Sequence, residues 1–154
     1  MTTGTEREAL LSTLEETVRD VLAYFEGPGA TSAARVGEWG PKEVLSHFLH
    51  WHQATIEGME AVARGAAPWK ATEATDEANA GAVARFRSES VGQLVARARQ
   101  LQARLVQAAR ALPSLDTPVM LRHDGTAQTG RDRLERIPRH WREHVAELRA
   151  QEGR

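Results

Sequence analysis

The sequence predicts an all-α protein, a four-helix bundle in up-down order with longer connections between its helices. Three observations predict this fold. Apolar residues recur every three or four positions along four long segments, glycine and proline separate those segments, and no useful stretch alternates apolar with polar residues. Four amphipathic helices each need a partner for their apolar face, which a bundle supplies. We expect residues 1–154 to form a single domain.

The first helix is expected to begin at Thr5. Thr5 and Glu8 have the spacing of a capping box, in which each side chain bonds the backbone N–H of the other residue. Gly27 and Pro28 end this helix. Its apolar face consists of Leu10, Leu11, Leu14, Val18, Val21, Leu22 and Phe25.

The second helix is expected to begin at Pro41, because a missing N–H costs nothing at the first helical position. Gly40 is then its cap, and Trp39 can pack on Val44 as a hydrophobic staple. The apolar pattern continues to Gly65.

Two further helices follow a polar connection. A short one is expected from Asp76 to about Arg87. A long amphipathic one follows, where Ser90 and Gln93 form a capping box and Pro113 ends the helix.

The segment 114–128 is predicted to be a long loop, with a turn at His123-Asp124-Gly125. The last helix is expected from about Thr129 to Gln151. Pro138 lies inside it and should kink or restart it, because proline lacks an N–H and clashes with the preceding turn.

The composition excludes several classes of protein. Twenty Lys+Arg against 21 Asp+Glu give a formal net charge of −1, unlike the basic surface of a nucleic-acid-binding protein. The absence of cysteine excludes disulfides, cysteine-ligated zinc and a protein thiol nucleophile. No apolar run reaches the roughly 20 residues that cross a bilayer, and the N-terminus does not resemble a signal peptide. We expect a cytoplasmic protein that acts on a small molecule and binds neither nucleic acid nor membrane.

Histidines on the apolar faces are the candidate functional residues. His140 and His144 lie on the stripe of the last helix that contains Ile137, Trp141 and Val145. They are four residues apart, so both imidazoles project from the same side, one turn apart. This is a spacing that can hold one metal ion.

A third histidine, His47, lies on the apolar side of the second helix, between Val44 and Trp51. It can meet the other pair across the core, where bundles build their metal sites. Three neutral imidazoles suit a divalent ion such as zinc, nickel or iron, and they leave a coordination position open for a substrate.

The histidines also allow other interpretations. All three can be hydrogen-bonded core residues without a metal. His50, on a neighbouring face, can replace His47 as the ligand after a slight rotation of the helix. His52 is expected to face solvent, and His123 to cap a turn.

Three segments, in this order, resemble the DinB/YfiT-like superfamily of metal-dependent helical bundles. The segment from Trp39 to Trp51 is similar to the second-helix signature, in which a tryptophan precedes the helix and an aromatic residue follows the ligand histidine by four positions. His140-Trp-Arg-Glu-His144 resembles the closing His-x-x-x-His. Thr75-Asp76-Glu77-Ala78-Asn79 is similar to an Asp-x-x-Asn element of the ClbS/DfsB-like branch.

The resemblance implies a four-helix bundle, often a homodimer, with a divalent metal held by His47, His140 and His144. Some members of the superfamily transfer a low-molecular-weight thiol such as mycothiol or bacillithiol, and others are mycothiol-dependent isomerases. ClbS-like members hydrolyse a genotoxin. The resemblance therefore indicates a metal-dependent enzyme in which a thiol or water attacks a small electrophile. The alternative is a non-catalytic bundle that binds a metal, a ligand or a partner.

Three residues are candidates for the wall of a substrate pocket. Asp76 and Asn79 can point into its mouth, although an aspartate before a helix is more often the N-cap. Trp69 lies in a connection, where a large aromatic side chain needs a covering surface. Trp51 and Trp141 can also line a pocket, although packing in the core is the more common place for such residues. Solvated helix faces are the expected place of Arg85, Arg87, Arg97, Arg99 and Arg104.

Overall fold

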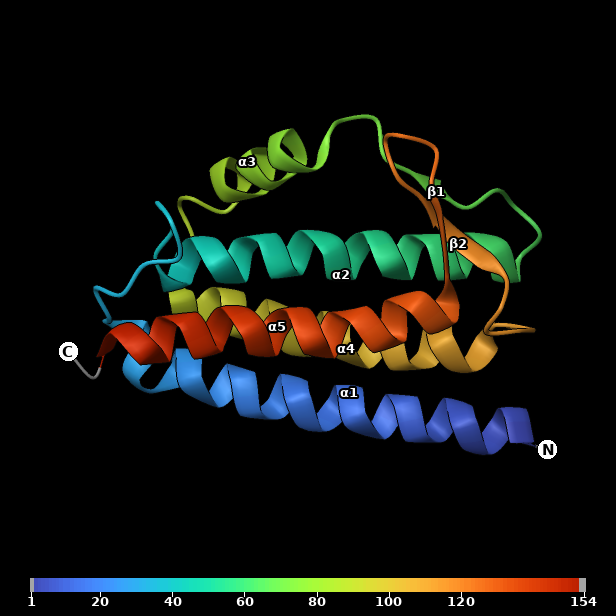
Figure 1. The fold of residues 1–154 in the computed structure, drawn as a ribbon, viewed down its shortest axis with the longest axis horizontal. Coiled ribbons are helices and arrows are strands. Elements are labelled where there is room, and N and C mark those ends of the chain that lie inside the picture. Colours follow the sequence, from blue (N-terminus) through green and yellow to red (C-terminus); the bar gives the residue numbers. More distant parts are fainter. Residues whose placement is uncertain (1, 153–154) are drawn as a thin grey trace.

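The computed structural model describes residues 2–152 and confirms the predicted helical bundle (Figure 1). Four long helices pack along one another in these residues: α1 (Thr2–Glu26), α2 (Pro41–Ala63), α4 (Val91–Ala111) and α5 (Gly130–Glu152). A short 3-10 helix, η1 (Pro28–Ala30), follows α1. None of the described helices is long and apolar enough to cross a membrane.

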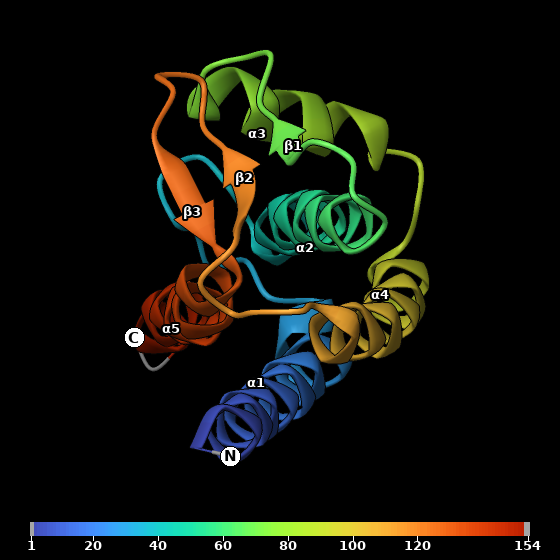
Figure 2. The ribbon, with the colours of Figure 1, turned by 90° about the vertical axis from the view of Figure 1, so that its right-hand side faces the viewer.

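Seen end-on, the helices surround the core in the order α1, α4, α2, α5 (Figure 2). Helices α2 and α4 run in the same direction, because the connection between them returns the chain to the end where α2 begins (Figure 1). That connection contains β1 (Trp69–Lys70) and α3 (Thr75–Arg85), and α3 lies on the outer side of α2. Helix α5 then runs opposite to α2 beside it, so the start of α2 faces the C-terminal half of α5.

The core consists of the apolar stripes of the four long helices, largely as their spacing predicts. Phe48 of α2 stacks on Trp141 of α5, with ring centroids 4.5 Å apart and planes 8° from parallel. Both rings are nearly inaccessible to solvent. Such a flat contact fixes the separation and the rotation of the two helices, and this determines which of their side chains meet.

The segment predicted to be a long loop forms part of a small sheet instead. Strand β2 (Pro118–Leu121) pairs with β1 in parallel and with β3 (Ala127–Thr129) in antiparallel register. The strands have two to four residues, too few for an alternating pattern to stand out in the sequence. The predicted turn is confirmed: Gly125 has φ of 88°, and the Asp124 carboxylate accepts a 2.9 Å hydrogen bond from the Thr126 N–H.

Two of the predicted helix starts are confirmed and one is wrong. Gly40 precedes α2, and its N–H donates to Glu43 at 2.8 Å. Ser90 precedes α4, and its hydroxyl accepts from the Gln93 N–H at 3.1 Å. Thr5 does not cap α1, because the helix already begins at Thr2.

The last helix, α5, runs unbroken through Pro138, which is buried, so the predicted restart does not occur. Its start is set by reciprocal bonds between Thr129 and Asp132, at 2.9 and 3.1 Å. Gly130 fits closely at this point, since a Cβ there would lie 2.8 Å from Leu112.

Gly58 is the residue that lets α2 approach β2, and its replacement tests this contact. A Cβ at position 58 would lie 2.0 Å from the backbone oxygen of Val119. We expect Gly58→Ala to lower the free energy of unfolding by about 1–3 kcal/mol, because backbone cannot give way as a flexible side chain can. Gly81→Ala is the matched control, since nothing lies within 4 Å of a Cβ in that helix. It should stabilise the protein by about 0.4–1 kcal/mol. Urea unfolding of both variants measures the difference, and equal effects would contradict the proposed close approach.

Candidate metal centre and adjoining pocket

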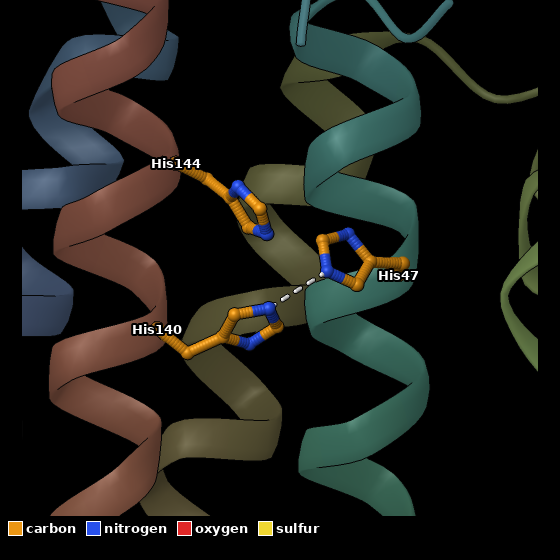
Figure 3. A group of neighbouring side chains, drawn as sticks. All are labelled: His47, His140 and His144. Atoms are coloured by element: carbon orange, nitrogen blue, oxygen red, sulfur yellow. Dashed lines mark hydrogen bonds between the residues drawn. The ribbon is translucent and has the colours of Figure 1, made fainter. Parts of the chain in front are cut away.

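Three histidines from two facing helices converge: His47 from α2, and His140 and His144 from α5 (Figure 3). One ligand nitrogen of each lies within 4.8 Å of those of the other two. The Nε2 atoms of His47 and His140 are 3.3 Å apart. Helical spacing places two of the rings on one side of α5, and the Phe48–Trp141 contact brings the third ring opposite them.

Burial keeps two imidazoles of this cluster, those of His47 and His140, uncharged at neutral pH. His47 is 2% exposed, while His140 and His144 are partly exposed. Burial, and then the neighbouring His140 and His144, lower the pKa of His47 to about 3. Burial, followed by His144 and two arginines, lowers the pKa of His140 to about 4. Neutral imidazole is the form that binds a metal ion.

The surroundings of the cluster are aromatic on one side and open on the other. Trp39 packs on the His47 ring with 4.9 Å between ring centroids. The His144 Nδ1 lies 3.1 Å from a carboxylate oxygen of Glu147, a contact that can hold this ring in position. The buried Nδ1 of His47 has no hydrogen-bond partner among the described residues.

The donor set fits a small divalent cation. Nitrogen ligands lie about 2.0–2.1 Å from zinc. Two such ligands at a tetrahedral ion are therefore roughly 3.4 Å apart, close to the 3.3 Å between the Nε2 atoms of His47 and His140. Three protein ligands leave one position of a tetrahedral ion for a substrate, as in catalytic zinc sites.

The other histidines lie outside this cluster. His50 points toward the tryptophans, with its ring centroid 4.8 Å from Trp51 and 6.3 Å from Trp69. His52 was expected to face solvent, and this is wrong: it is 1% exposed, and its Nε2 lies 2.8 Å from Oε1 of Gln102 on α4. His123 is exposed in the turn between β2 and β3.

A pocket opens beside the histidine cluster, between α2, α3, α5 and the sheet, with a cavity of about 80 Å³. His140 is one of its lining residues, so the cluster and the pocket adjoin. The other lining residues are Trp51, Thr75, Asn79, Met120, Arg122, Gln128, Arg133 and Arg136. No carboxylate lines it.

The three residues predicted for a pocket wall have different places. Asn79 lines the pocket, and its side-chain oxygen accepts a 2.6 Å hydrogen bond from the Trp51 indole. Asp76 is exposed in the first turn of α3, where Ala74 has the N-cap position, so the capping interpretation is wrong. Trp69 lines a separate surface hollow with Glu57 and Glu60.

Three arginines of the pocket were not identified from the sequence. Arg122 is in the connection after β2, while Arg133 and Arg136 precede His140 on α5. Their spacing of three and four residues along the helix could have indicated that Arg133, Arg136 and His140 share a face. The arginines predicted on solvated faces are indeed exposed, and Arg97, Arg99 and Arg104 pair with glutamates.

Comparison with known proteins supports the fold. No family model matches the chain, and no curated protein matches it in sequence. Two solved structures are similar to it: the mycothiol-dependent maleylpyruvate isomerase, with a TM-score of 0.75, and a histidine-to-alanine mutant of that enzyme, with 0.74. Each is 17% identical to this chain, which is covered over 96% of its length and spans 63% of theirs. This likeness establishes the helical fold.

Buried histidine should make the stability depend on pH. The pKa of His52 is lowered to about 4 by burial, from 6.5 when exposed. Between these values the unfolded chain binds a proton that the folded chain does not, so stability falls as the pH is lowered from 6.5 to 4. One such group contributes up to about 1.4 kcal/mol per pH unit. We expect His52→Leu to flatten this dependence, measured by urea unfolding from pH 7 to 4.5.

The control for this experiment is His123→Gln, which changes an exposed histidine and should leave the slope as it is. His47 and His140 add to the slope in all three proteins, so the difference between variants isolates His52. An unchanged slope in His52→Leu would contradict the assignment of His52 as neutral and buried.

Proposed function

We propose that the chain is a divalent-metal-dependent enzyme in which His47, His140 and His144 hold zinc, nickel or iron, and a low-molecular-weight thiol or water attacks a small electrophile. The observation that carries this proposal is the convergence of three histidine nitrogens, within 4.8 Å of one another, at the edge of a pocket. Structural ligand sets are closed by four protein ligands, whereas three leave room for substrate. We also propose, from the resemblance, a homodimer.

The residues around the cluster have distinct roles in this proposal. When bound, a divalent ion lowers the pKa of a thiol or water that coordinates it and so supplies a nucleophile at neutral pH. The histidines bind the ion in their neutral form. Phe48 and Trp141 exclude water from the side facing the core. Trp51 and Asn79, joined by a hydrogen bond, give the pocket a wall of fixed shape.

One observation supports a thiol as the nucleophile, and the composition is compatible with it. The chain contains no cysteine, so any thiol must come from a small molecule. The similar solved enzyme is mycothiol-dependent, and we propose mycothiol or bacillithiol for this chain as well. Asn79 lines the pocket and belongs to the element that resembles the ClbS/DfsB-like branch. Members of that branch catalyse a hydrolysis, so we propose water as the alternative nucleophile.

A second function, a non-catalytic bundle, is favoured by one contact. The 3.3 Å between the Nε2 atoms of His47 and His140 is also a hydrogen-bond distance, so one ring can donate to the other without a metal. The two functions differ in whether the histidines bind an ion and whether that ion accepts a further ligand.

Metal analysis tests the ligand assignment. Tag-free protein that has not been exposed to a nickel column should contain about one ion per chain, and His144→Ala should bind that ion at least about tenfold more weakly. Even the loss of a residue that only orients a ligand typically costs 10–100-fold in affinity. His123→Ala, which changes an exposed histidine, should keep the wild-type content. Absence of metal after reconstitution with zinc, nickel, iron and manganese would overturn the proposal, and so would equal loss in both variants.

Cobalt substitution tests the open position. If the bound ion accepts a thiolate, adding mycothiol to cobalt-loaded protein should produce a thiolate-to-cobalt charge-transfer band in the near ultraviolet. S-methylated mycothiol, which cannot form a thiolate, is the control. A cobalt spectrum that neither thiols nor anions change would favour the non-catalytic function.

A further inference from the structure

None of the three arginines that line the pocket forms an ion pair with a carboxylate of the described residues. Arg133 is 5% exposed, and both of its hydrogen bonds go to neutral groups: its Nε donates to the Thr55 hydroxyl at 3.0 Å and its Nη1 to Gln128 at 3.1 Å. No acidic residue of the described chain forms an ion pair with it. Burying an unpaired cation costs several kcal/mol, which is why buried arginines normally face an anion.

Neighbouring positive charges make the burial of the Arg133 cation more unfavourable. The Nη2 of Arg122 donates to Thr75 at 3.2 Å, and Arg136 lines the same cavity. Burial, and then these two arginines, lower the pKa of Arg133 to about 9. Elsewhere on the surface, arginines such as Arg97 and Arg104 have glutamate partners. The pocket therefore gathers positive charge that the described residues offset only weakly: Asp132 raises the pKa of Arg133, as the smallest of these influences and without forming an ion pair with it.

We propose that this pocket binds the carboxylate of a small organic acid, with Arg133 and Arg136 as its ligands and Arg122 contributing from the opposite wall. A planar guanidinium donates two parallel hydrogen bonds to a carboxylate, a geometry that a fixed, buried side chain such as Arg133 favours. The role of this acid as the substrate of the enzyme rests on the proposed function. Its binding to the arginines does not require a metal.

The spacing along α5 limits the size of the acid. Arg136 and Arg133 precede His140 by four and seven residues, which corresponds to roughly 6 and 10 Å along a helix. An acid whose carboxylate meets the arginines therefore places an atom only a few bonds away beside the histidine cluster. The pocket beside the histidine cluster is where such an acid would lie.

Succinate is the probe for this site, and its neutral diamide, succinamide, is the matched control. The chain has four tryptophans, and Trp51 is the one that lines the pocket. In two-dimensional NMR spectra of the full chain, we expect succinate to shift the Trp51 indole N–H resonance in a saturable way. Succinamide should leave it in place, and the Trp141 resonance should not move with either.

Three variants locate the binding. Arg136→Gln should weaken succinate binding at least about tenfold, whereas Arg139→Gln, an exposed charge on the same helix outside the pocket, should change it less than about twofold. Arg133→Lys keeps the positive charge but loses the two parallel N–H donors of the guanidinium, and should also weaken succinate binding. If Arg133→Lys fails to fold, the Arg136 and Arg139 pair still decides. Equal effects of that pair, or no response of Trp51 to succinate, would overturn the site.

Two further titrations test whether the pocket prefers a carboxylate to phosphate, and whether succinate binding requires the metal. Inorganic phosphate is titrated in the same way, and binding tighter than that of succinate would overturn the assignment to a carboxylate. Every titration is repeated after the metal has been removed with a chelator. Arginine-dependent succinate binding in a chain that never holds a metal supports this site while the proposed enzyme fails. A metal-loaded chain that ignores succinate overturns this site alone.

Discussion

The candidate site depends on one contact, the stacking of Phe48 on Trp141 between α2 and α5. Each ring directly follows a histidine in the sequence, His47 on α2 and His140 on α5. Successive helical residues are about 100° apart, so fixing the direction of the aromatic rings also fixes the direction of the imidazoles beside them. The hydrophobic effect thus pre-organises the polar cluster, because the same stack that excludes water from the core holds the two Nε2 atoms 3.3 Å apart.

The polar groups on and beside this contact are expensive to bury. Three imidazoles meet, and the Nδ1 of His47 has no partner in the described chain. Arg133, which precedes His140 by seven residues on α5, is buried with only neutral hydrogen-bond partners. Buried polar groups are normally satisfied, and exceptions call for an explanation. The proposed anion at the arginines would account for the burial of Arg133, and the proposed cation, bound through the Nε2 of His47, would account for the meeting of three imidazoles.

The sequence predicted the bundle and the histidine trio because both follow from helical periodicity, which fixes the side of a helix on which a residue lies. It did not predict what covers that side. His52 lies on the flank of α2 and was expected in solvent, but α4 supplies Gln102 there as a partner. Arg133 lies in a polar run that looks solvated, and it is buried against Thr55 of α2 and Gln128 of β3. The strands themselves are too short to leave a pattern. The periodicity of apolar residues within one helix can be read from a single sequence. Whether a polar residue beside the apolar stripe is buried depends on which distant segment packs against it.

The proximity of the two proposed subsites, the histidine cluster and the arginines of the pocket, has a thermodynamic consequence. Without ligands, the arginines of the pocket contribute to the lowered pKa of His140, behind burial and His144, and so help to keep it neutral and able to coordinate. A divalent ion at the histidines would be repelled by the same arginines. An anion in the pocket between them would be attracted by both, and would offset that repulsion. Metal and carboxylate should therefore each strengthen the binding of the other by the same factor, since coupling between two bound ligands is reciprocal. An enzyme of the proposed kind would therefore hold its metal most tightly when an acid substrate is present, because His140 lines the same pocket as the arginines.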